Sequence, residues 1–111
     1  MFTAVQVSGS EFVERGNPLQ LVCNATGRPE PPHNVEWYKD GEKVNSDANS
    51  GVIITKKIET RMLVSVLVIK SSRMDNSGDY VCRSSNRDFG KITVQVLNGL
   101  YSIKFKKTTF L

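Results

Sequence analysis

The sequence predicts an all-β protein folded as a two-sheet sandwich. Apolar and polar residues alternate in short runs, which is the two-residue period of half-buried strands. Glycine, proline, asparagine and aspartate cluster between these runs, where the chain is expected to turn. No stretch of about 11 residues keeps the 3.6-residue apolar period of a helix. About seven to nine runs follow one another along the chain, a number that suits two packed sheets.

The first half of the chain contains two clear strands. Residues 19–25 alternate so that Leu19, Leu21, Cys23 and Ala25 share one face, and residues 35–39 turn Val35 and Trp37 inward. The other expected elements are a strand or strand pair within 3–13, a turn at 14–18, a loop at 27–34 and a hairpin turn at Asp40-Gly41.

The second half begins with a polar loop at 45–51 and a short strand at 52–55. A longer strand at 61–69 carries two apolar sets, with Leu63, Leu67 and Ile69 on one face and Met62, Val64, Val66 and Val68 on the other. The expected elements after it are a corner at 71–78, a strand at 79–84, a hairpin loop at 86–90, and a last strand that ends near Leu97.

We expect residues 1–97 to form one domain and residues 98–111 to be a poorly ordered tail. The whole chain has 111 residues and a net charge of +4. Three lysines, Lys104, Lys106 and Lys107, lie in the tail, and without them the 12 remaining basic residues nearly balance the 11 acidic ones. A nucleic-acid binder needs a basic face within its fold, so we expect no nucleic-acid partner. The longest apolar stretch, 64–69, is far too short to cross a bilayer.

Three residues carry most of the information: Cys23, Trp37 and Cys82. Each cysteine lies mid-strand on an apolar face, and the tryptophan lies between them in the sequence. In a two-sheet sandwich this arrangement lets a disulfide cross the core with the indole packed on it. Two unpaired buried cysteines are the alternative, because free cysteine is also a good core residue.

A second signature surrounds Tyr80, two residues before Cys82, where its hydroxyl can return to the backbone upstream. Together, Cys23, Trp37, Leu67-x-Ile69 and Gly78-x-Tyr80-x-Cys82 resemble the immunoglobulin superfamily, over about residues 5–97. The resemblance implies a Greek-key sandwich with an inter-sheet disulfide, of the I-set or V-like type. One departure is Asn76, where the family usually has Asp, so a weaker corner is expected.

A finer resemblance involves Val44-Asn45-x-Asp47, Gly51-Val52, Thr55 and Lys57. These residues are similar to the second immunoglobulin domain of the invertebrate neuronal defective-proboscis-extension-response and zwei-Ig proteins. That likeness implies neuronal recognition and synapse organisation, with a first immunoglobulin domain, absent here, making the main partner contacts. The expected partners are other cell-surface proteins of the superfamily, and the membrane is reached only through missing parts of the full-length protein.

Two surface features are candidates for function. Asn24-Ala25-Thr26 is an N-glycosylation sequon, and alternation turns Asn24 outward from Cys23, although so short a pattern also arises by chance. If Leu63, Leu67 and Ile69 face the core, then Val64, Val66 and Val68 face outward as a candidate contact surface. Ordinary β-propensity explains those valines equally well.

No catalytic or metal chemistry is predicted. His33 is the sole histidine, in a proline-rich loop without other ligands, and two cysteines with one histidine do not make a zinc site of the usual kinds. Carboxylate pairs such as Glu36 with Glu59 lack a nucleophile or pocket beside them. The sequence therefore predicts a protein that is not an enzyme, with no cofactor and no small-molecule substrate.

The expected function is extracellular cell-surface recognition or adhesion. The first ten residues, MFTAVQVSGS, do not read as a signal peptide, which suggests a fragment. The alternative is a cytosolic structural domain of a muscle or cytoskeletal filament protein. That alternative predicts reduced Cys23 and Cys82 and an unmodified Asn24.

Overall fold

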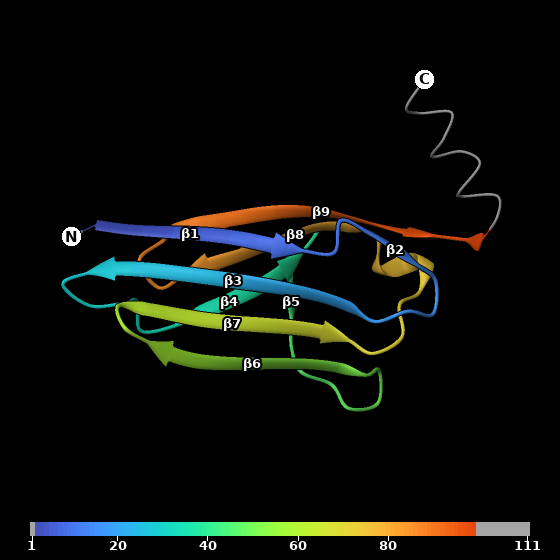
Figure 1. Ribbon diagram of the computed structural model, residues 1–111, viewed down its shortest axis with the longest axis horizontal. Helices are drawn as coiled ribbons and strands as arrows, with labels where there is room; N and C mark the ends of the chain where they lie inside the picture. Colours follow the sequence, from blue (N-terminus) through green and yellow to red (C-terminus); the bar gives the residue numbers. More distant parts are fainter. Residues whose placement is uncertain (1, 100–111) are drawn as a thin grey trace, which may run out of the picture.

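The computed structural model describes residues 2–99 and forms nine strands in two facing sheets (Figure 1). The four-stranded sheet has the order β1-β3-β7-β6, and the five-stranded sheet has the order β2-β9-β8-β4-β5. The elements are β1 (Phe2–Gly9), β2 (Phe12–Glu14), β3 (Leu19–Arg28), β4 (Val35–Lys39), β5 (Glu42–Val44), β6 (Val52–Glu59), β7 (Met62–Ile69), the 3₁₀ turn η1 (Met74–Asn76), β8 (Gly78–Ser84) and β9 (Phe89–Leu97). The predicted all-β sandwich is confirmed.

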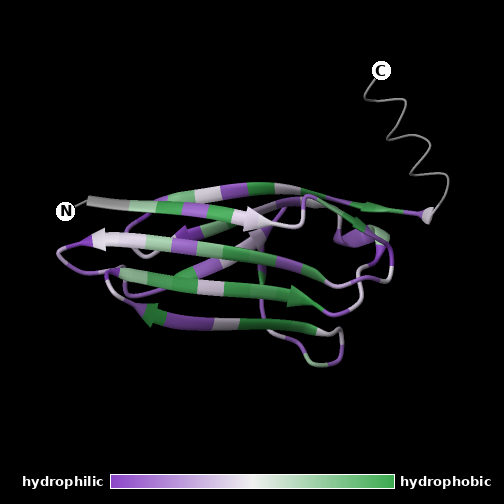
Figure 2. Cartoon of the chain, in the orientation of Figure 1, coloured by the Kyte–Doolittle hydropathy of each residue, from purple (hydrophilic) through white to green (hydrophobic). Residues whose placement is uncertain are grey.

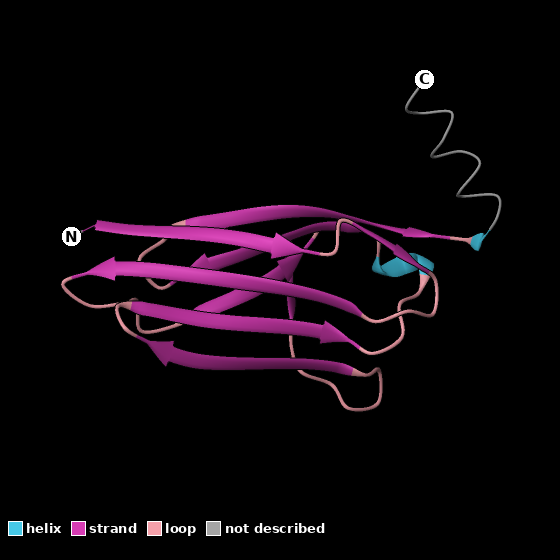
Figure 3. Ribbon diagram, in the orientation of Figure 1, coloured by secondary structure: helices cyan, strands magenta, loops and turns pink. Residues whose placement is uncertain are grey.

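Alternation in the sequence becomes the core between the sheets. Along β3, Leu19, Leu21, Cys23 and Ala25 are buried, while the residues between them face outward. β7 alternates in burial in the same way, although it is apolar almost throughout, as its colour in Figure 2 shows. Burial of these apolar side chains is the main favourable contribution to folding. The loops lie at the two ends of the sandwich (Figure 3).

The first segment is a strand pair whose members join different sheets. β1 pairs antiparallel with β3, whereas β2 pairs parallel with β9. Gly9 ends β1 with a φ of +140°, and a Cβ there would collide with the Gln20 carbonyl oxygen and lie 2.9 Å from Leu21 Cα. Only glycine allows this close approach while the chain leaves one sheet for the other.

Several strand boundaries differ from the prediction. β6 continues to Glu59 rather than stopping at Thr55, because its whole length pairs with β7 although its second half is mostly charged. β3 likewise runs on to Arg28, paired with β1 at this end. β9 starts at Phe89, inside the expected loop at 86–90, and pairs there with Arg83. In each case pairing with a neighbour extends a strand beyond its own apolar pattern.

The expected tail is described only at its first two residues, where the Gly99 N–H donates to Glu14 Oε2 at 3.2 Å. Residues 100–111 lie outside the described part of the chain, so the tail stays a prediction. Across residues 2–99, no helix has the length and apolar character needed to cross a membrane.

Gly9→Ala tests the close approach between β1 and β3. We expect the free energy of unfolding to fall by about 2–4 kcal/mol, from overpacking and backbone strain together. Gly16→Ala is the control, because Gly16 also has positive φ (+93°) but nothing lies within 4 Å of a Cβ there; backbone strain alone should cost about 1–2 kcal/mol. Urea unfolding measures both, and equal losses would contradict a crowding requirement at Gly9.

Candidate functional site

The disulfide joins the two sheets at the centre of the sandwich. Cys23 on β3 and Cys82 on β8 lie 6.3 Å apart at Cα, their sulfur atoms are 2.02 Å apart, and neither residue is exposed. The cysteines are 59 positions apart in the sequence. Closing a loop of this length stabilises the folded state by about 4 kcal/mol in the chain-entropy model. The disulfide that the sequence predicted is therefore confirmed.

A hydrogen bond runs between the sheets beside the disulfide. Trp37 on β4 is opposite Cys82, and Ser65 on β7 is opposite Cys23. The buried Trp37 Nε1 donates to Ser65 Oγ at 2.9 Å, and only 1% of Trp37 and none of Ser65 is exposed. The cross-strand neighbours of the two cysteines are thus bonded to each other.

Ser65 is the important residue that the sequence analysis missed. In the sequence Ser65 only interrupts the apolar stretch 64–69, but in the structure it satisfies the one donor of a buried indole. A usable signal existed, because a serine at an inward position is costly to bury unless something donates to it. The buried tryptophan needed an acceptor for the same reason.

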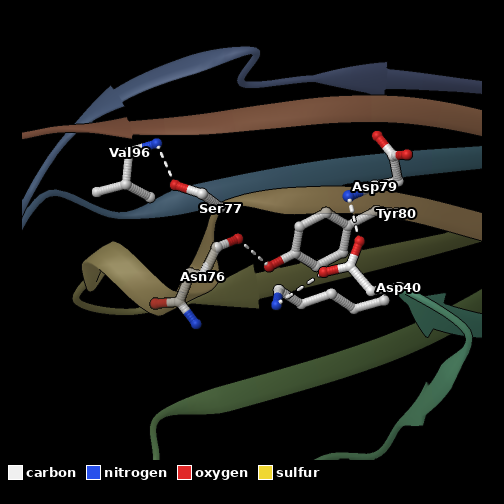
Figure 4. Close-up of polar contacts among 7 residues, drawn as sticks. Asp40, Asn76, Ser77, Asp79, Tyr80 and Val96 are labelled. Atoms are coloured by element: carbon white, nitrogen blue, oxygen red, sulfur yellow. Dashed lines mark hydrogen bonds and ion pairs between the residues drawn. The ribbon is translucent and has the colours of Figure 1, made fainter.

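Tyr80 anchors the turn before β8 at one end of the sandwich (Figure 4). Its hydroxyl donates to the Asn76 carbonyl oxygen at 2.6 Å, and the side chain is 1% exposed. Burial, followed by the negative charges of Asp40 and Asp75, raises the pKa of Tyr80 to about 12. This is the corner that the Gly78-x-Tyr80-x-Cys82 motif predicted.

Asn76 holds the same turn without a charge. Its Oδ1 accepts from the Arg73 backbone N–H at 2.7 Å, and so closes the 3₁₀ turn η1. The neighbouring Asp75 forms an ion pair with Arg73, with Oδ2 2.6 Å from Nη2. This hydrogen bond lowers the pKa of Asp75. The weaker corner expected from Asn76 stays a prediction about stability.

Asp40 ties the β4–β5 turn to the start of β8. Its Oδ1 accepts from the Asp79 backbone N–H at 3.0 Å, as drawn in Figure 4. That bond, with a second from Lys39, lowers the pKa of Asp40. Its carboxylate also lies against Gly78, where a Cβ would come within 3.1 Å of Asp40 Cγ. Gly78 in the motif therefore makes room for this carboxylate.

The outer face of the four-stranded sheet carries the sequon and the valines. Asn24 is half-buried on β3 and is opposite Val64 on β7. Val66 and Val68 follow Val64 along β7 on the same face, all half-buried. The structure thus brings together two features that the sequence analysis treated separately.

The outer face of the five-stranded sheet is charged and aromatic. Glu36 and Arg83 are cross-strand neighbours, and next to Arg83 stands Phe89, with 65% of its surface exposed. Lys43 Nζ lies 2.6 Å from Glu36 Oε2, and this hydrogen bond lowers the pKa of Glu36. Aromatic residues and arginine, here Phe89 and Arg83, are the types enriched at protein–protein interfaces.

The carboxylates considered as pairs lie in different sheets or beside basic residues, and His33 lies in a loop. Glu36 and Glu59 belong to different sheets, Asp75 pairs with Arg73, and Asp79 lies 3.4 Å from Lys91. His33 is exposed, and its backbone N–H donates to Ser85 Oγ at 3.1 Å. Within residues 2–99, no group of three or more histidine, cysteine or acidic residues could hold a metal ion.

Comparison with known proteins identifies the family. A family model described as an immunoglobulin domain matches residues 3–86. The chain belongs to the immunoglobulin superfamily. Human Roundabout homolog 2 is 35% identical over 76 residues, which cover 68% of this chain and 5% of that protein. The muscle M-line assembly protein unc-89 of Caenorhabditis elegans is 37% identical over 75 residues, which cover 68% of this chain and 1% of that protein.

A solved structure shares the fold. A chain in the crystal structure of Dpr2 Ig1-Ig2 in complex with DIP-Theta Ig1-Ig3 matches with a TM-score of 0.76 and 15% identity, covering 88% of this chain and 51% of that chain. At this identity the likeness shows the fold alone. Immunoglobulin domains of these kinds are typically non-enzymatic binding and adhesion modules.

Ser65→Ala tests the hydrogen bond between the sheets. Removing the acceptor leaves the buried Trp37 N–H unpaired, so the free energy of unfolding should fall by about 1–3 kcal/mol. Ser8→Ala on the exposed face of β1 is the control and should change stability by less than about 0.5 kcal/mol. Denaturant unfolding followed by tryptophan fluorescence measures both. Equal effects at the two sites would show that the bond does not stabilise the sandwich.

Tyr80→Phe tests the buried phenol at high pH. The pKa of Tyr80 is about 12 in the folded protein and near 10 in an unfolded chain, so the unfolded state loses the proton first. The stability tied to this proton is full below pH 10 and is lost as the pH rises through 12. Between these values the wild type should lose up to about 1.4 kcal/mol per pH unit more than the variant. Urea unfolding at a series of pH values measures this, and parallel curves would contradict it.

Proposed function

We propose that this chain is a non-enzymatic extracellular recognition or adhesion domain of a cell-surface protein. The disulfide between Cys23 and Cys82 is the observation that carries the proposal. Structural disulfides persist in oxidising compartments and are rare in the cytosol. Because this bond closes a long loop through the core, a domain that relied on it would suit the cell exterior.

The proposed partners are other cell-surface proteins, with superfamily members foremost. The solved neighbour is a complex of immunoglobulin-domain proteins, and Roundabout homolog 2 is a relative. The outer face of the five-stranded sheet offers aromatic anchors among charged groups: half-buried Tyr38 on β4 and exposed Phe89 lie near the Glu36–Lys43 ion pair. Such a surface gives specificity by polar complementarity and needs no small-molecule pocket.

The finer proposal is a neuronal surface protein that acts in synapse organisation. It is supported by the motif resemblance around Val44-Asn45-x-Asp47 and Gly78-x-Tyr80-x-Cys82. The domain would be one of several in a longer glycoprotein attached to the membrane through other parts. Asn24 is the proposed glycan site, and Val64, Val66 and Val68 beside it are proposed as an apolar surface that another group contacts.

A second candidate is a cytosolic structural domain in a muscle filament protein. The similarity to unc-89, at 37% identity, favours this candidate. It requires Cys23 and Cys82 to be thiols and Asn24 to be unmodified, because the cytosol is reducing and lacks this modification. The two candidates therefore predict different covalent states of the same residues.

The oxidation state of the native protein distinguishes them. The protein is isolated from its source tissue, alkylated without reduction and weighed as peptides that contain Cys23 and Cys82. We expect a cross-linked pair that takes no alkyl group, and labelling of the protein on intact cells by a membrane-impermeant amine reagent. Two alkylated cysteines together with no surface labelling would overturn the extracellular proposal in favour of the filament candidate.

A further inference from the structure

An apolar patch lies on the outer face of the four-stranded sheet. Val22 on β3 is opposite Val66 on β7, and Val68 is opposite Ile53 on the edge strand β6. The valines are half-buried, and 39% of Ile53 is exposed. Outward positions on a solvated sheet are usually polar, so a contiguous apolar patch indicates that something covers it.

The sequon lies within this patch. Asn24 is two residues from Val22 on the same face of β3, and it stands directly opposite Val64. Thr26 shares that outer face, since Ala25 between them is buried. Directly opposed side chains on neighbouring strands have Cβ atoms about 5 Å apart. A group attached to Asn24 therefore starts within contact distance of the valines.

Polar groups stand at both ends of the row that contains Asn24. Gln6 on β1 is opposite Asn24, and Lys57 on β6 is opposite Val64. The order across the sheet is thus Gln6, Asn24, Val64, Lys57. Both end residues are exposed. This row combines an apolar floor with hydrogen-bonding side chains, which matches a sugar ring that has a C–H face and a hydroxyl rim.

We propose that an N-linked glycan on Asn24 covers this patch and excludes a protein partner from it. The first sugar rings contact Val22, Val64 and Val66 with their C–H faces, and Gln6 and Lys57 bond their hydroxyls. The occupant of the candidate valine surface is then the protein's own carbohydrate. Partners are left with the opposite sheet and the loops. This inference rests on the proposed function, because the modification requires passage through the secretory pathway.

The glycan must be attached to Asn24 before the four-stranded sheet forms. Asn24 Nδ2 forms a bond to the anomeric carbon of a lipid-pyrophosphate-linked oligosaccharide, the bond from that carbon to the pyrophosphate oxygen breaks, and Nδ2 releases one proton. β3 pairs with β1 on one side and β7 on the other along the sequon. A strand held on both sides cannot bend into a transferase site, so attachment precedes formation of the sheet.

The occupancy test uses the full chain secreted from cultured insect cells behind a host signal peptide. Thr26→Ser keeps the sequon, whereas Thr26→Val destroys it and retains the β-branched shape. Intact mass should show one glycan on the wild type and on Thr26→Ser, and none on Thr26→Val. A wild-type protein secreted without sugar would overturn the inference, while leaving the native disulfide, and so the proposed function, untouched.

The covering test asks whether the sugar and the valines stabilise each other. Val66→Thr is made with the sequon intact and in the Thr26→Val background. Val66→Thr should lower the melting temperature by about 2–4 °C more in the glycoprotein than in the Thr26→Val background. Val81→Thr, a half-buried outward valine on β8 of the opposite sheet, is the matched control and should show no such difference. An apolar fluorescent dye should also bind the wild-type protein several-fold more strongly after enzymatic removal of the glycan. A glycan that leaves both readouts unchanged would overturn the covering role.

Discussion

The link between the two sheets is the constraint on which the rest of the structure depends. Each sheet has an apolar inner face, and neither sheet could hold that face out of water alone. The disulfide between Cys23 and Cys82 fixes their separation, and the hydrogen bond from Trp37 to Ser65 repeats the connection through the cross-strand neighbours. One covalent and one polar contact therefore act at the same level of the core. The surrounding apolar residues fill the space that these contacts define.

The end of the sandwich near η1 is held by side chains bonded to backbone. Tyr80 reaches the Asn76 carbonyl, Asp40 accepts from the Asp79 N–H, and Ser77 Oγ accepts from the Val96 N–H at 2.9 Å (Figure 4). These contacts satisfy backbone groups where the ladders stop. They hold the end of the five-stranded sheet in place without using side chains of the two outer faces. The outer faces can therefore differ, one apolar beside a sequon and the other charged and aromatic.

The sequence alone could predict the features that depend on the two-residue apolar period and on the few cysteine, tryptophan and tyrosine residues. Alternation identified the inward faces of β3 and β7, and cysteine, tryptophan and tyrosine gave the inter-sheet bond and the corner. It could not predict the length of β6, because residues 56–59 are mostly charged and their strand form is set by β7. Nor could it place Asn24 opposite Val64, since the register between β3 and β7 is a property of the assembled sheet. The inward position of Ser65 indicates that it needs a partner, but only the assembled sheets show that the partner is Trp37.

The edge strand β6 has a consequence for strand pairing between copies of this protein. Asp47 and Ser46 bond to the backbone of β6 as far as Ile54, and beyond that residue the edge can accept a strand from a neighbouring molecule. Lys56, Lys57 and Glu59 stand along that edge, and Lys57 is paired with Glu59 at 3.4 Å. A second copy approaching in this way would have to strip water from ammonium groups before any ladder bond formed. The charged residues that hide the strand pattern in the sequence therefore oppose edge-to-edge aggregation through β6.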